Sequence, residues 1–88
     1  MLNNDNFYCR VCGYRNSTPP WGEDGHTPLY DYCPCCGVEH GYQDASTAGA
    51  KKYREEWVNG GAKWHESQIK PVGWELEEQL NNVPTDFR

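Results

Sequence analysis

The residues most able to do chemistry in this 88-residue chain are its cysteines. Cys9 and Cys12 form one C-x-x-C pair, and Cys33 and Cys36 form a second. A glycine follows each pair and supplies the positive φ that a tight turn around a metal ion often needs. Four thiolates at this spacing are typical of a closed structural site, whereas a catalytic site keeps one position open for water. The sequence therefore predicts one metal ion bound by these four cysteines.

Cys35 is the fifth cysteine and lies beside Cys36 in the sequence C-P-C-C. We expect it at the exposed middle of its turn, because adjacent residues cannot easily both reach one ion. Two interpretations are open: a redox-sensitive or nucleophilic thiol, and a tolerated small residue on a turn. The second is favoured, because no base is placed beside Cys35 and nearby negative charge makes a thiol less reactive.

Other groups that bind metals or transfer protons lie near the cysteines. His26 and His40 are each able to replace a cysteine ligand, although neither is needed. Several carboxylates are also close in sequence, but no spacing fixes two of them together for acid–base catalysis: Glu23, Asp24, Asp31, Glu39 and Asp44. The glycines lie in turns, so no phosphate-binding loop is predicted. We therefore expect a protein that is not an enzyme.

The charge of the chain limits the partners that it can bind. The formal net charge is −5, and a divalent ion bound by four thiolates changes it to −7. Nucleic acids and anionic membrane surfaces both select clustered Lys and Arg, so we expect neither as a partner. Because no signal peptide or membrane-spanning run is recognised, we expect a cytoplasmic protein, in which reducing conditions favour metal binding over disulfides.

Two short strands are predicted, at residues 7–10 and 29–32, each leading into a cysteine pair. They are expected to pair as a minimal hairpin beneath the metal. Pro19 and Pro20 exclude a helix from the loop between them.

The second half of the chain is predicted to be helical. A helix at 47–59, capped by Asp44 or Ser46, presents a buried stripe of Ala50, Tyr53 and Trp57. A second helix, near 74–82, presents Leu76, Leu80 and Val83.

Trp21 lies on a rigid loop between proline and glycine. In a small domain rich in Trp and Tyr, such a residue is more often a lid over the core than a binding anchor. Both readings stay open, and Trp21 is a candidate partner contact.

The cysteine turns resemble the metal-binding knuckles of rubredoxins. The residues that carry the resemblance are Phe7, Cys9, Val11, Cys12, Gly13 and Tyr14 in the first, and Cys33, Pro34, Cys36 and Gly37 in the second. In that family the four corresponding cysteines hold one iron atom, and the protein carries single electrons. This chain departs from the family in its shorter loop between knuckles, and in Asp31, where rubredoxins place an aromatic residue.

A second resemblance is to small bacterial cysteine-rich proteins named for a C-P-C-C motif. It is carried by residues 30–36 and by the acidic stretch from Glu39 to Asp44. In those proteins the motif belongs to the first knuckle, whereas here it belongs to the second. Neither resemblance covers residues 45–88.

These observations predict a small metal-stapled α+β fold. A rubredoxin-like zinc ribbon at 7–44 is followed by two short α-helices, in an extension at 45–88 that packs on it. Residues 7–88 then form a single domain, preceded by a loose N-terminus at 1–6.

The leading functional hypothesis is a non-catalytic zinc protein that binds an unidentified protein partner, as an adaptor or an immunity-type module. Soft thiolates bind zinc or iron, but zinc is favoured over ferrous iron at equal geometry. The alternative is a rubredoxin-like iron protein that transfers electrons.

Overall fold

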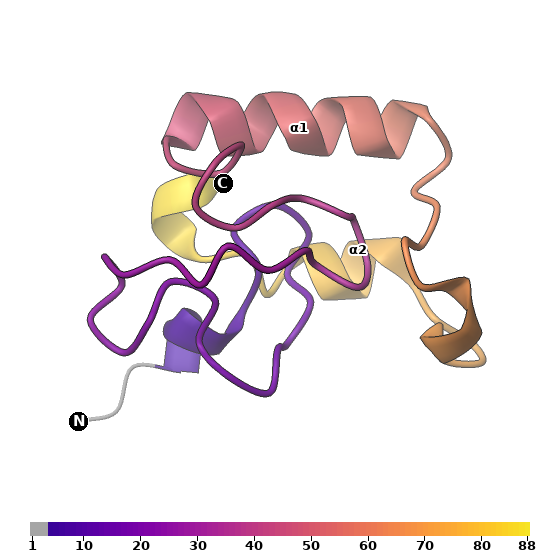
Figure 1. Ribbon diagram of the computed structural model, residues 1–88. Helices are drawn as coiled ribbons and strands as arrows, with labels where there is room; N and C mark the ends of the chain where they lie inside the picture. Colours follow the sequence, from indigo (N-terminus) through magenta and orange to yellow (C-terminus); the bar gives the residue numbers. More distant parts are fainter. Residues whose placement is uncertain (1–3) are drawn as a thin grey trace.

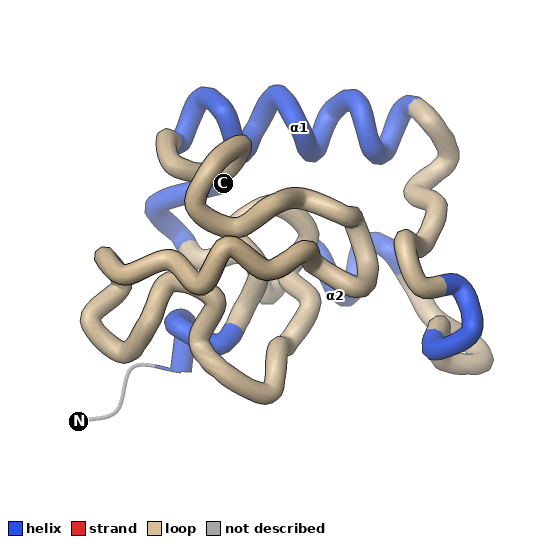
Figure 2. The backbone as a smooth tube through the Cα atoms, in the orientation of Figure 1, coloured by secondary structure: helices blue, strands red, loops and turns tan. Residues whose placement is uncertain are grey.

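The computed structural model describes residues 4–88, and its regular elements are few (Figure 1). In chain order they are the 3-10 turn η1 (Asn4–Phe7), helix α1 (Thr47–Asn59), the 3-10 turn η2 (Ser67–Ile69), helix α2 (Leu76–Leu80) and the 3-10 turn η3 (Thr85–Phe87). Loops and turns make up residues 8–46, which lie beneath α1 in Figure 2. Of the predicted loose N-terminus, residues 1–3 lie outside the described residues, and 4–6 belong to η1.

The two cysteine turns share one pattern of backbone hydrogen bonds. In the first, Cys9 N–H donates to the carbonyl of Tyr14 at 2.9 Å, and Gly13 N–H donates back to Cys9 at 3.0 Å. The same bonds recur 24 positions later, from Cys33 N–H to Val38 and from Gly37 N–H to Cys33. We call residues 7–16 the first knuckle and residues 31–40 the second knuckle.

The predicted hairpin between residues 7–10 and 29–32 is wrong. Each segment instead folds back on its own knuckle, through single bridges that join Tyr8 to Arg15 and Tyr32 to Glu39. The knuckles use the backbone groups that a hairpin would need, and residues 4–88 contain no strand. The α+β class and the ribbon are therefore not confirmed, and the structure shows a small fold of two helices with a group of four cysteines.

The prediction of a helix at 47–59 is confirmed as α1. The Ser46 hydroxyl caps it by accepting a hydrogen bond from Gly49 N–H at 3.0 Å. Ala50 is fully buried in the same core cluster as the cysteines. Four residues further along the same face, Arg54 donates to the carbonyl oxygens of Val11 and Arg10 in the first knuckle. Helix α1 therefore lies directly against that knuckle.

Helix α2 is shorter than the predicted 74–82. At its N-terminus, Glu75 makes no side-chain capping bond, and Trp74 N–H closes a turn onto Pro71. At its C-terminus, the backbone N–H groups of Asn82 and Val83 close turns onto Gln79 and Leu80. The helical pattern therefore extends past the ends of the helix into turns.

A chain of aromatic rings joins the first knuckle to the second half of the protein. Tyr14 meets Trp64 edge-on at 5.7 Å between ring centroids, and Trp64 meets Trp74 at 5.5 Å. Trp57 of α1 extends this row of rings at 6.4 Å from Trp74.

The radius of gyration, 11.9 Å, is close to the roughly 12 Å expected of a compact chain of this length. None of the helices in the described residues has the length and apolar character needed to cross a membrane.

Gly13 tests how α2 is placed on the first knuckle. Its φ is +79°, and a Cβ there would collide with the backbone oxygen of Gln79. Gly73 has almost the same φ, +77°, but no atom within 4 Å of such a Cβ. Both Gly→Ala changes incur the left-handed strain of about 1–2 kcal/mol, and only Gly13→Ala must also displace α2.

We therefore expect Gly73→Ala to lower the free energy of unfolding by about 1 kcal/mol, and Gly13→Ala by about 3 kcal/mol or more. Denaturant unfolding of the metal-loaded proteins measures both. Equal losses for the two variants would show that α2 does not rest on Gly13.

Candidate metal centre

The four cysteines predicted as ligands come together in the structure. Their Sγ atoms all lie within 4.8 Å of one another. Cys9 Sγ is 3.8 Å from Cys36 Sγ, and Cys12 Sγ is 3.6 Å from Cys33 Sγ. A tetrahedron with metal–sulfur bonds of about 2.3 Å has sulfur–sulfur edges of about 3.8 Å. The spacing of the sulfurs therefore fits a single tetrahedral ion.

Burial makes these thiols dependent on a cation. Cys9, Cys12 and Cys33 are fully buried, and Cys36 is 6% exposed. Burial raises the pKa of Cys12 and of Cys36, whereas hydrogen bonds from the neighbouring thiols, that of Cys12 first, lower the pKa of Cys33. Four adjacent thiolates would repel one another. A bound metal ion that replaces the thiol protons supplies the positive charge that offsets this repulsion.

The backbone of the first knuckle supports the sulfurs directly. Val11 N–H points at Cys9 Sγ from 3.4 Å. Such N–H donors stabilise thiolate charge and fix the orientation of a ligand. The positive φ of Gly13 and Gly37, +79° in both, gives the two knuckles the same tight turn after the second cysteine.

A buried His–Asp pair lies against the second knuckle. His40 is 1% exposed and Asp44 is fully buried, and His40 Nδ1 is 2.9 Å from Asp44 Oδ2. Burial alone would lower the pKa of His40, but the hydrogen bond to Asp44 and then the contact with the Cys33 side chain outweigh it, and the pKa rises to about 10. His40 is therefore not one of the four clustered ligands but a cationic group beside them.

The other ring nitrogen of His40 supports this role. Nε2 is buried and has no hydrogen-bond partner within ordinary geometry. Since Nδ1 is hydrogen-bonded to Asp44, Nε2 is the ring nitrogen that remains available to donate to a thiolate. The side chain of Cys33 is beside the imidazole, and as a thiolate it would offer the acceptor that this nitrogen lacks, so the residues present fit a loaded metal site.

Asp44 is held by three donors. Besides His40, it accepts from Trp21 Nε1 at 2.9 Å and from Gly41 N–H at 2.8 Å. Burial would raise its pKa, but the bonds from His40 and then Trp21 lower it. Trp21 is therefore half-buried and bonded to Asp44, and its role as a partner contact stays a prediction.

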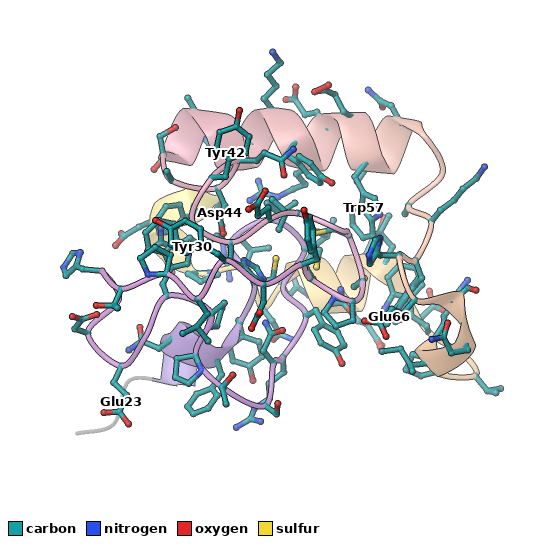
Figure 3. All side chains as sticks on the ribbon, viewed as in Figure 1. Glu23, Tyr30, Tyr42, Asp44, Trp57 and Glu66 are labelled. Atoms are coloured by element: carbon teal, nitrogen blue, oxygen red, sulfur yellow. The ribbon has the colours of Figure 1, made fainter. Side chains whose placement is uncertain are left out.

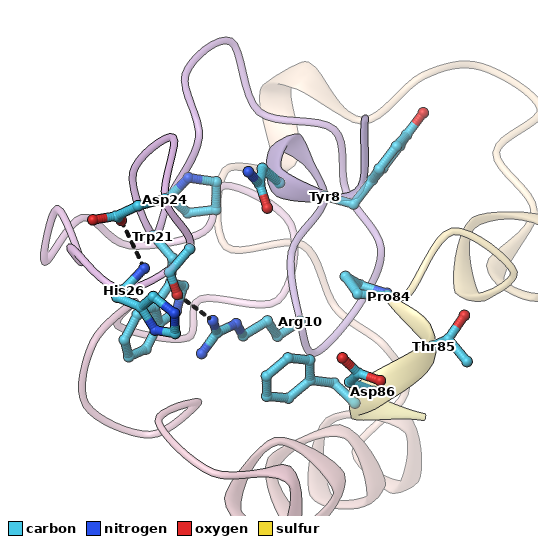
Figure 4. A pocket seen from close by; sticks show the side chains of 12 residues that line it. Tyr8, Arg10, Trp21, Asp24, His26, Pro84, Thr85 and Asp86 are labelled. Carbon is cyan, nitrogen blue, oxygen red and sulfur yellow. Dashed lines mark hydrogen bonds between the residues drawn. The ribbon is translucent and has the colours of Figure 1, made fainter. Parts of the chain in front are cut away.

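Arg10 lies between the two cysteines of the first knuckle. Its guanidinium is half-buried between two rings, 3.8 Å from the centroid of Trp21 and 4.2 Å from that of Phe87. It also donates to the carbonyl of Gly25 at 3.0 Å (Figure 4). These residues form part of the wall of a hollow of about 340 Å³, which His26 and Asp86 also line. His26 therefore belongs to this hollow and not to the cysteine group.

The prediction that Cys35 is exposed is wrong. Cys35 is fully buried, and the Gln79 amide of α2 donates both to its Sγ at 3.2 Å and to the carbonyl of Cys12 at 3.1 Å. Residues 65 and 66 cover the turn from the other side, where His65 N–H donates to the carbonyl of Cys35 at 2.8 Å. The second half of the chain thus covers the tips of both knuckles.

Arg54 and Gln79 are functional supports that the sequence reasoning missed. Arg54 donates to three carbonyl oxygens, those of Val11, Arg10 and Phe87, at 2.5 to 3.0 Å. Its place in the stripe was detectable, since it lies four residues after Ala50, but the apolar pattern alone does not single out a cation. The i, i+4 spacing of His40 and Asp44 was the available signal for that pair.

Comparison with known proteins finds two similar chains, both from Bacillus subtilis (strain 168). The chain is 32% identical over 73 residues to "Uncharacterized protein YozI", in an alignment that covers 65% of this chain and 60% of that protein. It is 27% identical over 70 residues to "Uncharacterized protein YoaQ", covering 62% and 59%. The chain thus spans about three fifths of the length of these curated relatives. No family model matches the chain, and no solved structure matches it.

The ligand set makes a direct prediction about single cysteine changes. Cys36→Ser should lose the bound metal and leave a poorly folded protein, because binding energy of such sites appears as folding energy. Cys35→Ser should keep one ion per chain and lose only about 1–2 kcal/mol of stability, from its packing and its bond to Gln79. Elemental analysis after gel filtration measures the metal. If Cys35→Ser lost the ion while Cys36→Ser kept it, the ligand assignment would be wrong.

The His40–Asp44 pair predicts a second contrast. His40→Gln leaves a buried carboxylate without its cation and should cost about 3–5 kcal/mol. Trp21→Phe removes one of three donors to the same carboxylate and should cost about 1 kcal/mol. Unfolding of the loaded proteins by denaturant measures both changes. A larger loss for Trp21→Phe would mean that the indole, and not the imidazole, holds Asp44.

Proposed function

We propose that the four cysteines hold zinc, and that the ion is structural. The observation that carries this proposal is the burial of all four thiols beneath both halves of the chain. A closed set of four thiolates leaves no position for water or substrate, which is the pattern of structural zinc sites. The shared hydrogen bonds of the two knuckles support the finer proposal that they are of the rubredoxin type.

An iron electron carrier remains the competing proposal, because thiolates also suit iron. Solvent exposure and hydrogen bonds to sulfur set the potential of such a centre. A carrier also needs a small exposed area close to the metal for brief docking. Here Arg54 and η3 cover the first knuckle, and Gln79 with residues 65 and 66 covers the second. This covering favours a structural ion.

For the protein as a whole we propose a non-catalytic role in the cytoplasm, as an adaptor or immunity-type module that binds another protein. The proposed metal ion and the residues around it hold the loops in place. The buried His40–Asp44 pair, with Trp21, is part of this framework. What these loops present is a surface with exposed tyrosines and an acidic balance, which suits a basic or mixed protein surface. Reducing conditions in the cytoplasm keep the five cysteines from forming disulfides.

Protein purified from its own host tests both parts of the proposal. We expect a colourless protein with one zinc per chain that elutes from gel filtration in a stoichiometric complex with a second protein. A red preparation that bleaches reversibly with dithionite would falsify the zinc assignment. Elution of the zinc protein alone from concentrated, gently lysed cells would contradict the interaction role.

A further inference from the structure

Exposed aromatic side chains gather on one part of the surface. Six large hydrophobic side chains in the described residues are exposed, and four of them lie within residues 29–42: Leu29 at 43%, Tyr30 at 60%, Tyr32 at 59% and Tyr42 at 72%. The other two, Ile69 and Val72, belong to the loop around η2. We call Tyr30, Tyr32 and Tyr42 the tyrosine surface.

The three tyrosines lie on the two arms that lead into and out of the second knuckle. Tyr32 is bridged to Glu39 through two backbone hydrogen bonds, from Cys33 N–H to Val38 and from His40 N–H to Asp31. The ring of Tyr30 lies over Gly41 on the other arm, since two of its ring carbons would lie 2.8 and 2.9 Å from a Cβ there. Tyr42 is the residue that follows Gly41, and Figure 3 labels both tyrosine side chains.

Two residues of the tyrosine surface, Tyr30 and Tyr32, are held by their surroundings. Tyr30 has a φ of +58°, a left-handed conformation that a bulky side chain adopts only where its surroundings enforce it. Gly41 provides the space that its ring occupies, and Tyr32 stacks on His65 with centroids 6.0 Å apart. Rigid tyrosines are effective binding groups because they lose little conformational entropy when a partner arrives.

The charge around these rings is negative. Residues 16–50 contain five carboxylates and no Lys or Arg. Asp31 lies between two of the tyrosines, and Glu39 lies opposite Tyr32. Neither carboxylate takes part in an ion pair with another residue of the described chain.

The cation–π contacts of the described residues lie elsewhere. Within residues 4–88, cation–π contacts join Arg10 to Trp21 and Phe87, Arg15 to Phe7, and Lys70 to Trp74. None of these contacts involves the tyrosine surface. Its rings and the carboxylates beside them are therefore open to cations from another molecule.

We propose that the tyrosine surface, with Asp31 and Glu39, binds an arginine-rich segment of a partner protein. This inference rests on the proposed interaction role and names the site and the chemistry of the partner. A guanidinium stacks on an aromatic face while it pairs with a carboxylate, whereas a lysine ammonium lacks the planar stacking surface. The same negative charge repels nucleic-acid phosphates and anionic membranes.

A short synthetic peptide of alternating Arg and Gly tests the proposal on the zinc-loaded, isotope-labelled full chain. We expect amide shifts confined to residues 29–32 and 39–43. The matching Lys–Gly peptide should bind more weakly, and a Glu–Gly peptide should not bind. Shifts centred on other residues, or equal binding of the Arg and Lys peptides, would overturn the proposal.

Variants of the surface provide the control. Tyr30→Asn removes the ring but keeps a residue that tolerates the left-handed conformation, and combined with Tyr42→Ser it should weaken Arg-peptide binding about tenfold. Val72→Ser removes an exposed apolar side chain outside the tyrosine surface and should leave binding unchanged. Unchanged amide dispersion in all variants establishes that they remain folded. Equal losses for the tyrosine and Val72 variants would overturn the proposal.

Capture from host lysate separates this inference from the function on which it rests. If wild type and the tyrosine double variant recover the same partner equally, the surface is wrong and the interaction role stands. If neither forms a complex, the interaction role itself fails. Loss of an Arg-rich partner from the double variant alone would support both.

Discussion

The structure depends on bringing four thiols together in a space from which water is excluded. Their sulfurs lie within 4.8 Å of one another, and the cysteines are buried. If the four thiols are ionised, their burial is unfavourable without a cation. If they stay protonated, the centre of a small core holds four S–H groups that form only weak hydrogen bonds. A tetrahedral ion resolves this conflict, and its binding energy, about 10 kcal/mol or more for such sites, is comparable to the whole stability of a small domain.

The surrounding residues complete this centre from both halves of the chain. Arg54 of α1 ties the carbonyls of the first knuckle to that of Phe87 near the C-terminus, with bonds of 2.5 to 3.0 Å. Gln79 of α2 connects the first knuckle to Cys35 in the second. Two cationic side chains, Arg54 and His40, thus lie close to a centre that carries net negative charge when loaded. The same contacts hold loops that contain no strand, including the loop that presents the exposed tyrosines.

Local patterns in the sequence predicted much of this arrangement. Cysteine spacing identified the four clustered thiols, because a C-x-x-C turn constrains its two sulfurs whatever lies around it. Apolar spacing, with Ser46 as the cap and a glycine pair at the end, identified the bounds of α1. In contrast, the hairpin failed because the β propensity of residues 7–10 and 29–32 does not reveal which backbone groups the knuckles already use.

The remaining errors concern what covers the knuckles. Cys35 was expected at an exposed tip, because a knuckle considered alone leaves its middle residues in water. The burial of Cys35, and of Arg10 in the first knuckle, depends on Arg54, Gln79 and Phe87. These residues lie 44 to 77 positions away from the ones they contact, and no local pattern records such long-range contacts. The role of His40 is also a tertiary property, since its spacing to Asp44 suggests a pair but not its contact with Cys33.

X-ray absorption at the metal edge of the loaded protein tests the central claim most directly, since it counts the atoms bound to the ion. The account predicts a single shell of four sulfurs at about 2.3 Å, with no nitrogen or oxygen ligand. A shell of three sulfurs with a nitrogen at about 2.0–2.1 Å would contradict it, and would identify a histidine, with His40 the nearest candidate, as a ligand in place of a cysteine.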